Sequence, residues 1–212
     1  MKKNFFPLFF KISDRKILLV GGGDVAERKI RQLLKFQCQL TVISPEASKF
    51  INTSARQGKI KWMKRPYISP EAVEYSMVIA ATDDMEMNRL VFNDAASNNI
   101  PVNVVDIPEL CTVYFPSIIE RGNITIAIGS DGKAPFFTRT VRESLEINIP
   151  DSLAKISLLA EKFREFMKEK CAGNFNLKNK MCQRFLKSVE NEPERWSVEN
   201  PPFDEWSEWL NE

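Results

Sequence analysis

The residues best suited to chemistry are glycines that follow an apolar run, in the stretch KILLVGGGDVAERKI. Gly21, Gly23 and Ala26 have the spacing G-x-G-x-x-A between a predicted strand and a predicted helix. In this context the first glycine takes a tight turn, the second lets the backbone approach a pyrophosphate, and the alanine lets helix and strand pack closely. The helix start offers unpaired N–H groups to the phosphates. The pattern predicts a bound dinucleotide; the alternative is a tight turn needed only for packing.

The residues after the second predicted strand bear on which dinucleotide would bind. A carboxylate there would bind a ribose 2′-OH, whereas an arginine would favour a 2′-phosphate. The strand ends at Ser44, which Pro45 and Glu46 follow, and the nearest base is Lys49. We count Ser44, Pro45 and Glu46 among the expected cofactor contacts, and the acid at Glu46 favours NAD over NADP.

Two further predicted strands end in polar residues. In AATDD, Thr82 is expected to hydrogen-bond the cofactor, while Asp83 and Asp84 either serve the site or cap the next helix. Asp106 ends the strand of VNVVD, and ligands of open α/β sheets bind at this edge. The chain has no histidine, so acid–base chemistry falls to other side chains. Spacing alone leaves two possibilities for Asp106: it is a base or a metal ligand, or it is a turn or cap residue.

These residues are positioned by strands and helices that alternate along the first half of the chain. Such alternation predicts an α/β fold, with a parallel sheet and helices on both of its faces. The predicted strands cover residues 16–20, 39–44, 59–64, 77–81 and 101–105, and the predicted helices cover 25–36, a stretch that ends at 56, and 86–97.

The second half has a different pattern. Two strands joined by a turn at residues 121–123 are predicted, followed by a helix with Pro135 in its first turn. Helices follow from Ser152, which we expect to be an N-cap. The strand NITIAIGS is too apolar for an exposed edge, which favours a homodimer. Among acids, the tail carries four aromatic residues, which either pack as a final helix or form a docking peptide: Trp196, Phe203, Trp206 and Trp209.

Composition excludes several classes of protein. The net charge of +2 on 212 residues names no partner, and we expect no nucleic-acid partner. No apolar run reaches the ~20 residues of a membrane span, and the N-terminal run, interrupted by Pro7, lacks a signal-peptide cleavage site. Four cysteines without C-x-x-C spacing favour reduced, mostly buried thiols rather than a zinc site. We expect a soluble cytoplasmic protein.

Four collinear stretches carry a resemblance to a known family. They are FPLFFKISDRKILLVGGGDVAERK, VIAATDD, VNVVDIPELCTVYFPSIIERG and ITIAIGSDGKAPFFTRTVRESLE, within residues 5–146. In them the chain resembles the precorrin-2 dehydrogenase family, which includes the N-terminal part of siroheme synthases. The resemblance implies an NAD-binding Rossmann domain over residues 1–112, a small α+β dimerisation domain over 113–150 and a C-terminal helical domain over 151–212.

The resemblance also implies an activity, namely oxidation of the tetrapyrrole precorrin-2 to sirohydrochlorin by NAD⁺. In some members the same site inserts Fe²⁺ to give siroheme. The family's cofactor loop falls on Asp24 and Val25, its important aspartate on Asp106, here also a candidate metal ligand, and its loop serine on Ser130. We take Asp106 and Ser130 as the catalytic candidates.

The loop GSDGKAP departs from the family pattern, because Asp131 replaces a glycine and Ala134 a serine. A second metal-facing carboxylate at Asp131 is left open. Precorrin-2 carries several carboxylates, so the bases that follow this loop are candidate substrate contacts, with solvent-facing helix residues as the alternative for the two arginines. They are Lys133, Arg139 and Arg142.

Two rival functions lack catalysis. One is a Rossmann module that binds NAD to regulate a partner, and the other is a carrier that hands tetrapyrroles onward. A sensor needs no second site, so the spacing of Asp106, Ser130 and the basic residues favours the enzyme.

Overall fold

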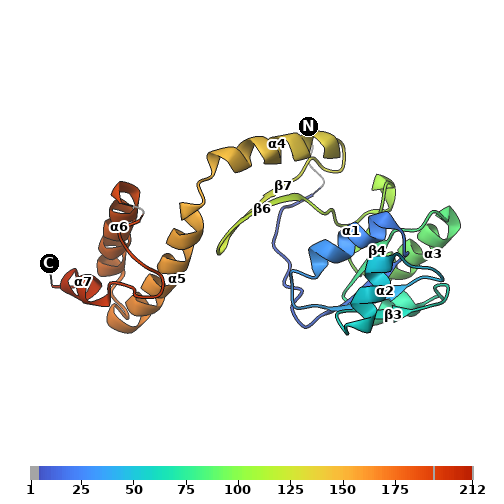
Figure 1. Cartoon of the computed structure of the whole chain (residues 1–212), viewed down its shortest axis with the longest axis horizontal. Helices are drawn as coiled ribbons and strands as arrows, with labels where there is room; N and C mark the ends of the chain where they lie inside the picture. Colours follow the sequence, from blue (N-terminus) through green and yellow to red (C-terminus); the bar gives the residue numbers. More distant parts are fainter. Residues whose placement is uncertain (1–4, 193, 212) are drawn as a thin grey trace. The chain divides into compact units, whose positions relative to one another are not determined.

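The computed structural model describes residues 5–192 and 194–211, and the chain divides into two compact units (Figure 1). The first unit holds the described residues up to 115 together with 131–133, and the second unit holds 116–130 and the described residues from 134 on. The predicted three-part division, with boundaries after residues 112 and 150, stays a prediction. Lys2 and Lys3, which precede the N-terminal apolar run, lie outside the described residues.

The first unit contains a parallel sheet of five strands in the order β3-β2-β1-β4-β5. In this order Val20 at the end of β1 lies between Ile43 on β2 and Ala80 on β4. The direction of strand addition reverses between β1 and β4, which is where Rossmann folds bind dinucleotides. The predicted Rossmann-type sheet is confirmed, with strands β1 (Lys16–Val20), β2 (Gln39–Ile43), β3 (Lys61–Met63), β4 (Met77–Ala80) and β5 (Val102–Val104).

Helices cover both faces of this sheet (Figure 1). On one face α1 (Asp24–Leu33) and α2 (Lys49–Arg56) pack through Ala26, Ile30 and Ile51. On the other face α3 (Met85–Ala96) and the 3₁₀ helix η1 (Glu71–Glu74) pack through Val91, Ala95 and Ala72. The strands are buried on both sides, which explains their nearly unbroken apolar sequences.

The second unit begins with an antiparallel hairpin, β6 (Ser117–Arg121) and β7 (Ile124–Ile128), followed by α4 (Pro135–Asn148). Pro135 lies in the first turn of α4, as predicted. The hairpin turn touches α5 (Ser152–Lys170), because a Cβ at Gly122 would collide with the Ser157 hydroxyl. That hydroxyl accepts a hydrogen bond from the Asn123 N–H at 2.9 Å.

The helical end of the second unit has its own aromatic core. Residues of α5, α6 (Phe175–Asn191) and α7 (Phe203–Glu208) enclose Trp206, which is fully buried. The ring centroid of Phe163 lies 4.7 Å from that of Phe185 and 4.9 Å from that of Trp206. The tail is therefore a packed final helix and not a free docking peptide.

Two smaller expectations need correction. Ser152 is the first residue of α5 rather than its N-cap, which is Asp151, and no side chain caps this helix. The cysteines are free thiols, as expected, but only Cys171 is fully buried and Cys182 is exposed. Among the described residues, no helix combines the length and the apolar character needed to cross a bilayer.

Candidate functional site

The predicted cofactor residues lie at the carboxyl edge of the sheet, in the turns after β1, β2 and β4. Gly21 follows β1 with φ of 128°, a conformation that favours glycine. Its N–H donates to the Ile43 carbonyl at 3.0 Å, and a Cβ on it would collide with the Ala81 carbonyl. The turn after β1 is thus pressed against the turns of both neighbouring strands, at the point where the strand order reverses.

The packing of the turn also requires a glycine at position 22, where the G-x-G-x-x-A pattern allows any residue. A Cβ there would collide with the Glu46 carbonyl and would lie 2.8 Å from the Ser44 hydroxyl. The Gly22 carbonyl also accepts the Ser48 N–H at 2.9 Å. The middle glycine therefore lets the loop after β2 pack directly on the glycine turn, a contact that spacing alone does not reveal.

Gly23 has the opposite surroundings. A Cβ at Gly23 would have nothing within 4 Å, and no side chain caps α1, which begins at Asp24 and Val25. By contrast, Ser48 caps α2 and Asp84 caps α3. The start of α1 combines open space with uncapped N–H groups, which is what a pyrophosphate requires. The residues present fit a dinucleotide.

The loop after β2 is held by side chains. Ser44 is buried, and its hydroxyl accepts a hydrogen bond from the Trp62 indole N–H at 3.1 Å. Ser48 donates its hydroxyl to a Glu27 carboxylate oxygen at 2.5 Å, and this bond, followed by that from Arg31, lowers the pKa of Glu27. Pro45 and Glu46 remain exposed on a fixed backbone.

The turn after β4 is organised by a buried asparagine that the sequence did not single out. Asn88 on α3 is 3% exposed; its side-chain oxygen accepts the Thr82 hydroxyl at 2.8 Å and its amide donates to the Thr82 carbonyl at 2.8 Å. Thr82 is therefore held in place by α3. Asp84 accepts the N–H groups of Glu86 and Met87, so the capping alternative holds for this residue.

Asp106 follows β5 at the same edge. It is exposed and left-handed, with φ of 61°, which a non-glycine residue adopts rarely and aspartate more readily than most. The Cys111 thiol donates to the carbonyls of Val104 at 3.1 Å and Ile107 at 3.3 Å, on either side of Asp106. Burial raises the pKa of Cys111, so the thiol stays a donor. These hydrogen bonds hold the backbone on both sides of Asp106.

Lys29 on α1 lies close to this loop, although the sequence assigned it no role. The half-buried ammonium lies 4.1 Å from the centroid of the Phe115 ring. Burial lowers the pKa of Lys29, with a further lowering from Arg28, while Cys111 and Asp106 act in the opposite direction. A desolvated positive charge therefore lies within electrostatic reach of Asp106.

The remaining predicted residues are divided between the units. Lys133 is exposed in the first unit, with Asp106. In the second unit, the Ser130 hydroxyl accepts the Ala134 N–H at 3.0 Å, just before α4. Arg139 and Arg142 pair with Glu143 on the same helix at 3.0 and 3.2 Å. Their roles toward a substrate stay predictions.

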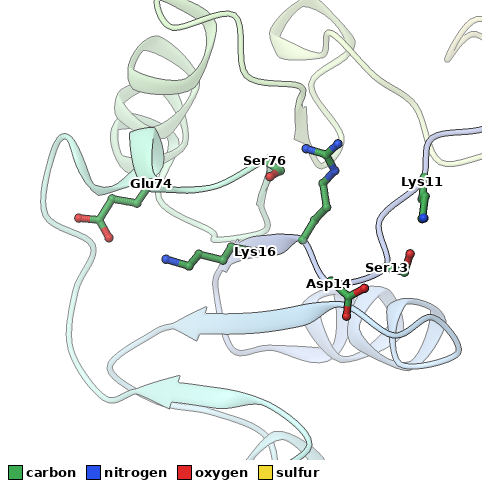
Figure 2. Close-up of a pocket in the computed structure, with 7 residues that line it drawn as sticks. Lys11, Ser13, Asp14, Lys16, Glu74 and Ser76 are labelled. Carbon is green, nitrogen blue, oxygen red and sulfur yellow. The ribbon is translucent and has the colours of Figure 1, made fainter.

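A hollow of about 440 Å³ lies at the other edge of the sheet. Figure 2 shows its lining, which includes Lys16 at the first position of β1 and Ser76 just before β4. The carboxylates of Asp14 and Glu74 balance part of the positive charge that lines this hollow. The hollow lies away from the glycine turn. Among the described residues, no three cysteine or carboxylate side chains gather as a metal site.

Comparison with known proteins agrees with this geometry. A family model described as putative NAD(P)-binding matches residues 8–117. The siroheme synthase of Ruthia magnifica is 41% identical over 79% of this chain and 35% of its own length, and that of Psychrobacter cryohalolentis is 44% identical over 79% and 32%. The chain thus spans about a third of these relatives. A solved structure titled "SirC, precorrin-2 dehydrogenase" has a TM-score of 0.76 at 21% identity, covers 98% of this chain and 99% of its own, and shows the same fold.

Proposed function

Because the chain belongs to the putative NAD(P)-binding family and is homologous to siroheme synthases, we propose that it oxidises precorrin-2 to sirohydrochlorin with NAD⁺. The observation that carries this proposal is the uncapped, open start of α1 at the strand reversal, with Asp106 at the same sheet edge. A regulatory module would need only the dinucleotide site at the start of α1. A tetrapyrrole carrier would need only the substrate side of the edge, near Asp106.

The residues of the glycine turn would hold the dinucleotide. Gly21 would shape the turn, because its own N–H is bonded to Ile43. The backbone N–H groups of Gly23, Asp24 and Val25 would donate to the pyrophosphate, and the exposed Glu46 would accept the ribose hydroxyls, which favours NAD over NADP. Ser44 and Thr82 would act by holding their loops, because Trp62 and Asn88 already engage their hydroxyls. When bound, NAD⁺ supplies a hydride acceptor.

Asp106 would act as the base. Conversion of precorrin-2 to sirohydrochlorin removes a hydride and a proton, and the carboxylate would take the proton. Ser130 stays the second catalytic candidate. Lys133, Arg139 and Arg142 would contact substrate carboxylates, for which each arginine would exchange its Glu143 partner. Fe²⁺, where it is inserted, would be a substrate at the same carboxylate.

We extend the proposal to a homodimer formed through the second unit. Every second residue of β7 is an isoleucine, yet most of the strand is exposed. A two-stranded hairpin is also only marginally stable by itself. On α4, Phe136 is 77% exposed and Ile147 is 86% exposed. A second copy would cover these apolar groups, and light scattering of the purified chain tests this. Action in the cytoplasm stays a prediction.

The decisive experiment is anaerobic incubation of the chain with precorrin-2 and NAD⁺, without and with Fe²⁺. NADH formation with the sirohydrochlorin spectrum is expected in both arms, and the siroheme spectrum in the second arm would add ferrochelatase activity. Binding of NAD⁺ without NADH formation would favour the regulatory or carrier function instead.

Asp106→Asn tests the base. Asparagine tolerates the left-handed backbone and removes the charge, so folding and NAD⁺ affinity should be retained. Turnover should fall by about 10²–10⁴-fold, the usual contribution of a general base. Circular dichroism and calorimetry are the controls, and turnover at the wild-type rate would remove Asp106 from the mechanism.

A further inference from the structure

Residues 131–133 cluster with the first unit, although the chain on either side of them belongs to the second. This short segment carries Lys133, a proposed substrate contact. Its backbone is left-handed at two successive residues, Asp131 with φ of 53° and Gly132 with φ of 74°. The question is which group in the first unit holds such a segment.

Tyr114 meets this segment through its ring. A Cβ on Gly132 would lie 2.7 Å from the ring carbon that bears the hydroxyl, so the Gly132 backbone lies directly against the tyrosine. The Phe5 ring packs edge-on against Tyr114, with centroids 4.4 Å apart. Only glycine allows this approach, since any side chain at position 132 would displace the ring and would also strain the backbone.

The same tyrosine holds the loop that carries Asp106. Its hydroxyl donates to the Pro108 carbonyl at 3.1 Å, in the 3₁₀ helix η2 (Pro108–Leu110) that begins two residues after Asp106. Burial raises the pKa of Tyr114, and the neighbouring Cys111, Glu109 and Asp131 raise it further, so the hydroxyl stays protonated and can donate.

We propose that Tyr114 is a positioning residue that joins the loop of Asp106 to the loop of Lys133. One side chain contacts Gly132 next to the lysine, and also the turn that follows the carboxylate. The base and a carboxylate-binding ammonium are thereby held on one surface of the first unit. This inference rests on the proposed function for its meaning in catalysis, but the coupling of the two loops is a property of the fold.

Two variants separate the two contacts. Tyr114→Phe keeps the ring against Gly132 and removes the hydrogen bond to Pro108, so kcat should fall about fivefold with little change in the KM for precorrin-2. Tyr114→Ala also removes the ring, so that KM should rise about tenfold as the Lys133 contact is lost. NAD⁺ affinity should be unchanged in both variants.

Hydrogen exchange provides a readout that does not depend on activity. Tyr114→Ala should speed exchange in peptides that cover residues 106–110 and 131–134, and Tyr114→Phe should speed it in 106–110 alone. Tyr67→Phe is the matched control, because the Tyr67 hydroxyl donates to Asp94 at 2.7 Å elsewhere in the first unit. The control should lower thermal stability without changing exchange in either peptide or KM.

The outcomes distinguish this inference from the proposed function. Wild-type exchange in both peptides of Tyr114→Ala would overturn the positioning role, even in an active enzyme. A similar KM rise in Tyr67→Phe would also overturn it, because the effect would then be general destabilisation. If the wild-type chain shows no turnover, the proposed function fails, and the exchange data alone decide whether Tyr114 couples the two loops.

Discussion

The carboxyl edge of the sheet has two sides that are built in different ways. Around β1 and β2 the site is made of backbone: Gly21 and Gly22 leave no room for a Cβ, and the loop after β2 rests on them. Around β5 it is made of side chains: Asp106 adopts a left-handed conformation, and Cys111 and Tyr114 hold its loop. Gly21 and Gly22 therefore leave no space for a side chain, whereas we expect the β5 side to vary as long as its contacts are replaced.

This difference follows from what each side must hold. A pyrophosphate is bound by N–H groups, so the chain itself must come close, and any side chain interferes. A base must present a carboxylate, and a left-handed non-glycine residue at roughly 1–2 kcal/mol persists only where its surroundings fix it. The fixing groups on the β5 side are the thiol of Cys111 and the hydroxyl of Tyr114.

The largest effect that sharpens this comparison is expected from two neighbouring glycines. Gly22→Ala brings a Cβ against the Glu46 carbonyl, so it should lower the free energy of unfolding by about 1–3 kcal/mol and weaken NAD⁺ binding together. The Cβ that Gly23→Asp adds has no protein atom within 4 Å, so the melting temperature should be unchanged. Its carboxylate should nevertheless repel the pyrophosphate and weaken binding about 100-fold, or roughly 2.7 kcal/mol.

Thermal melting and calorimetry on both variants check this pair. A Gly23→Asp protein that binds NAD⁺ like the wild type would show that the pyrophosphate does not lie at the start of α1. If Gly22→Ala kept the stability and the NAD⁺ affinity of the wild type, the loop after β2 would be free to move. The contrast between the two sides of the edge would then disappear.

The sequence revealed these two sides unequally. Gly21 and Gly23 stand in a local pattern whose spacing alone indicates the turn, and the apolar strands and helix periodicity give the sheet and most element bounds to within a few residues. Gly22, Asn88 and Tyr114 were missed, because each acts through a neighbour distant in sequence that only the folded chain brings near. Residue type and local spacing do not contain that information.

An intermediate effect is expected at Lys29, which lies between the two sides, on α1 but near Asp106. Lys29→Met keeps an apolar stem against Phe115 and removes the charge. Turnover should fall about tenfold, or roughly 1.4 kcal/mol of lost charge interaction. The same substitution at the exposed Lys59 is the control. Turnover of the Lys29→Met variant at the wild-type rate would show that Lys29 does not contribute to the site at Asp106.

The pH dependence of stability gives an independent check on Lys29. Its folded pKa is lower than its unfolded value, so burial of the charged form opposes folding at neutral pH. The cost is relieved as pH rises through the folded pKa toward 10.5, so this group makes the wild-type protein more stable over that interval. Lys29→Met should be more stable at neutral pH and should lack this rise; denaturant unfolding across that range measures it.

The smallest effect is expected at Asp131, which adopts a left-handed conformation where the resemblance implies a glycine. Asp131→Gly relieves the left-handed strain but adds backbone freedom to the unfolded chain, and these terms, each about 1 kcal/mol, nearly cancel. Asp131→Ala keeps the strain and loses the aspartate's tolerance for it, so it should melt earlier, by about 1 kcal/mol of unfolding free energy.

Enzyme assays of the Asp131 variants complete the test of the β5 side. If Asp131 serves only to set the backbone conformation, the Asp131→Gly variant should oxidise precorrin-2 at the wild-type rate, and any Fe²⁺ insertion should be unchanged. Loss of Fe²⁺ insertion with oxidation intact would instead make Asp131 the second carboxylate that faces the metal. An Asp131→Ala protein as stable as the wild type would contradict the strain argument, and with it the view that the β5 side depends on left-handed carboxylates held by their neighbours.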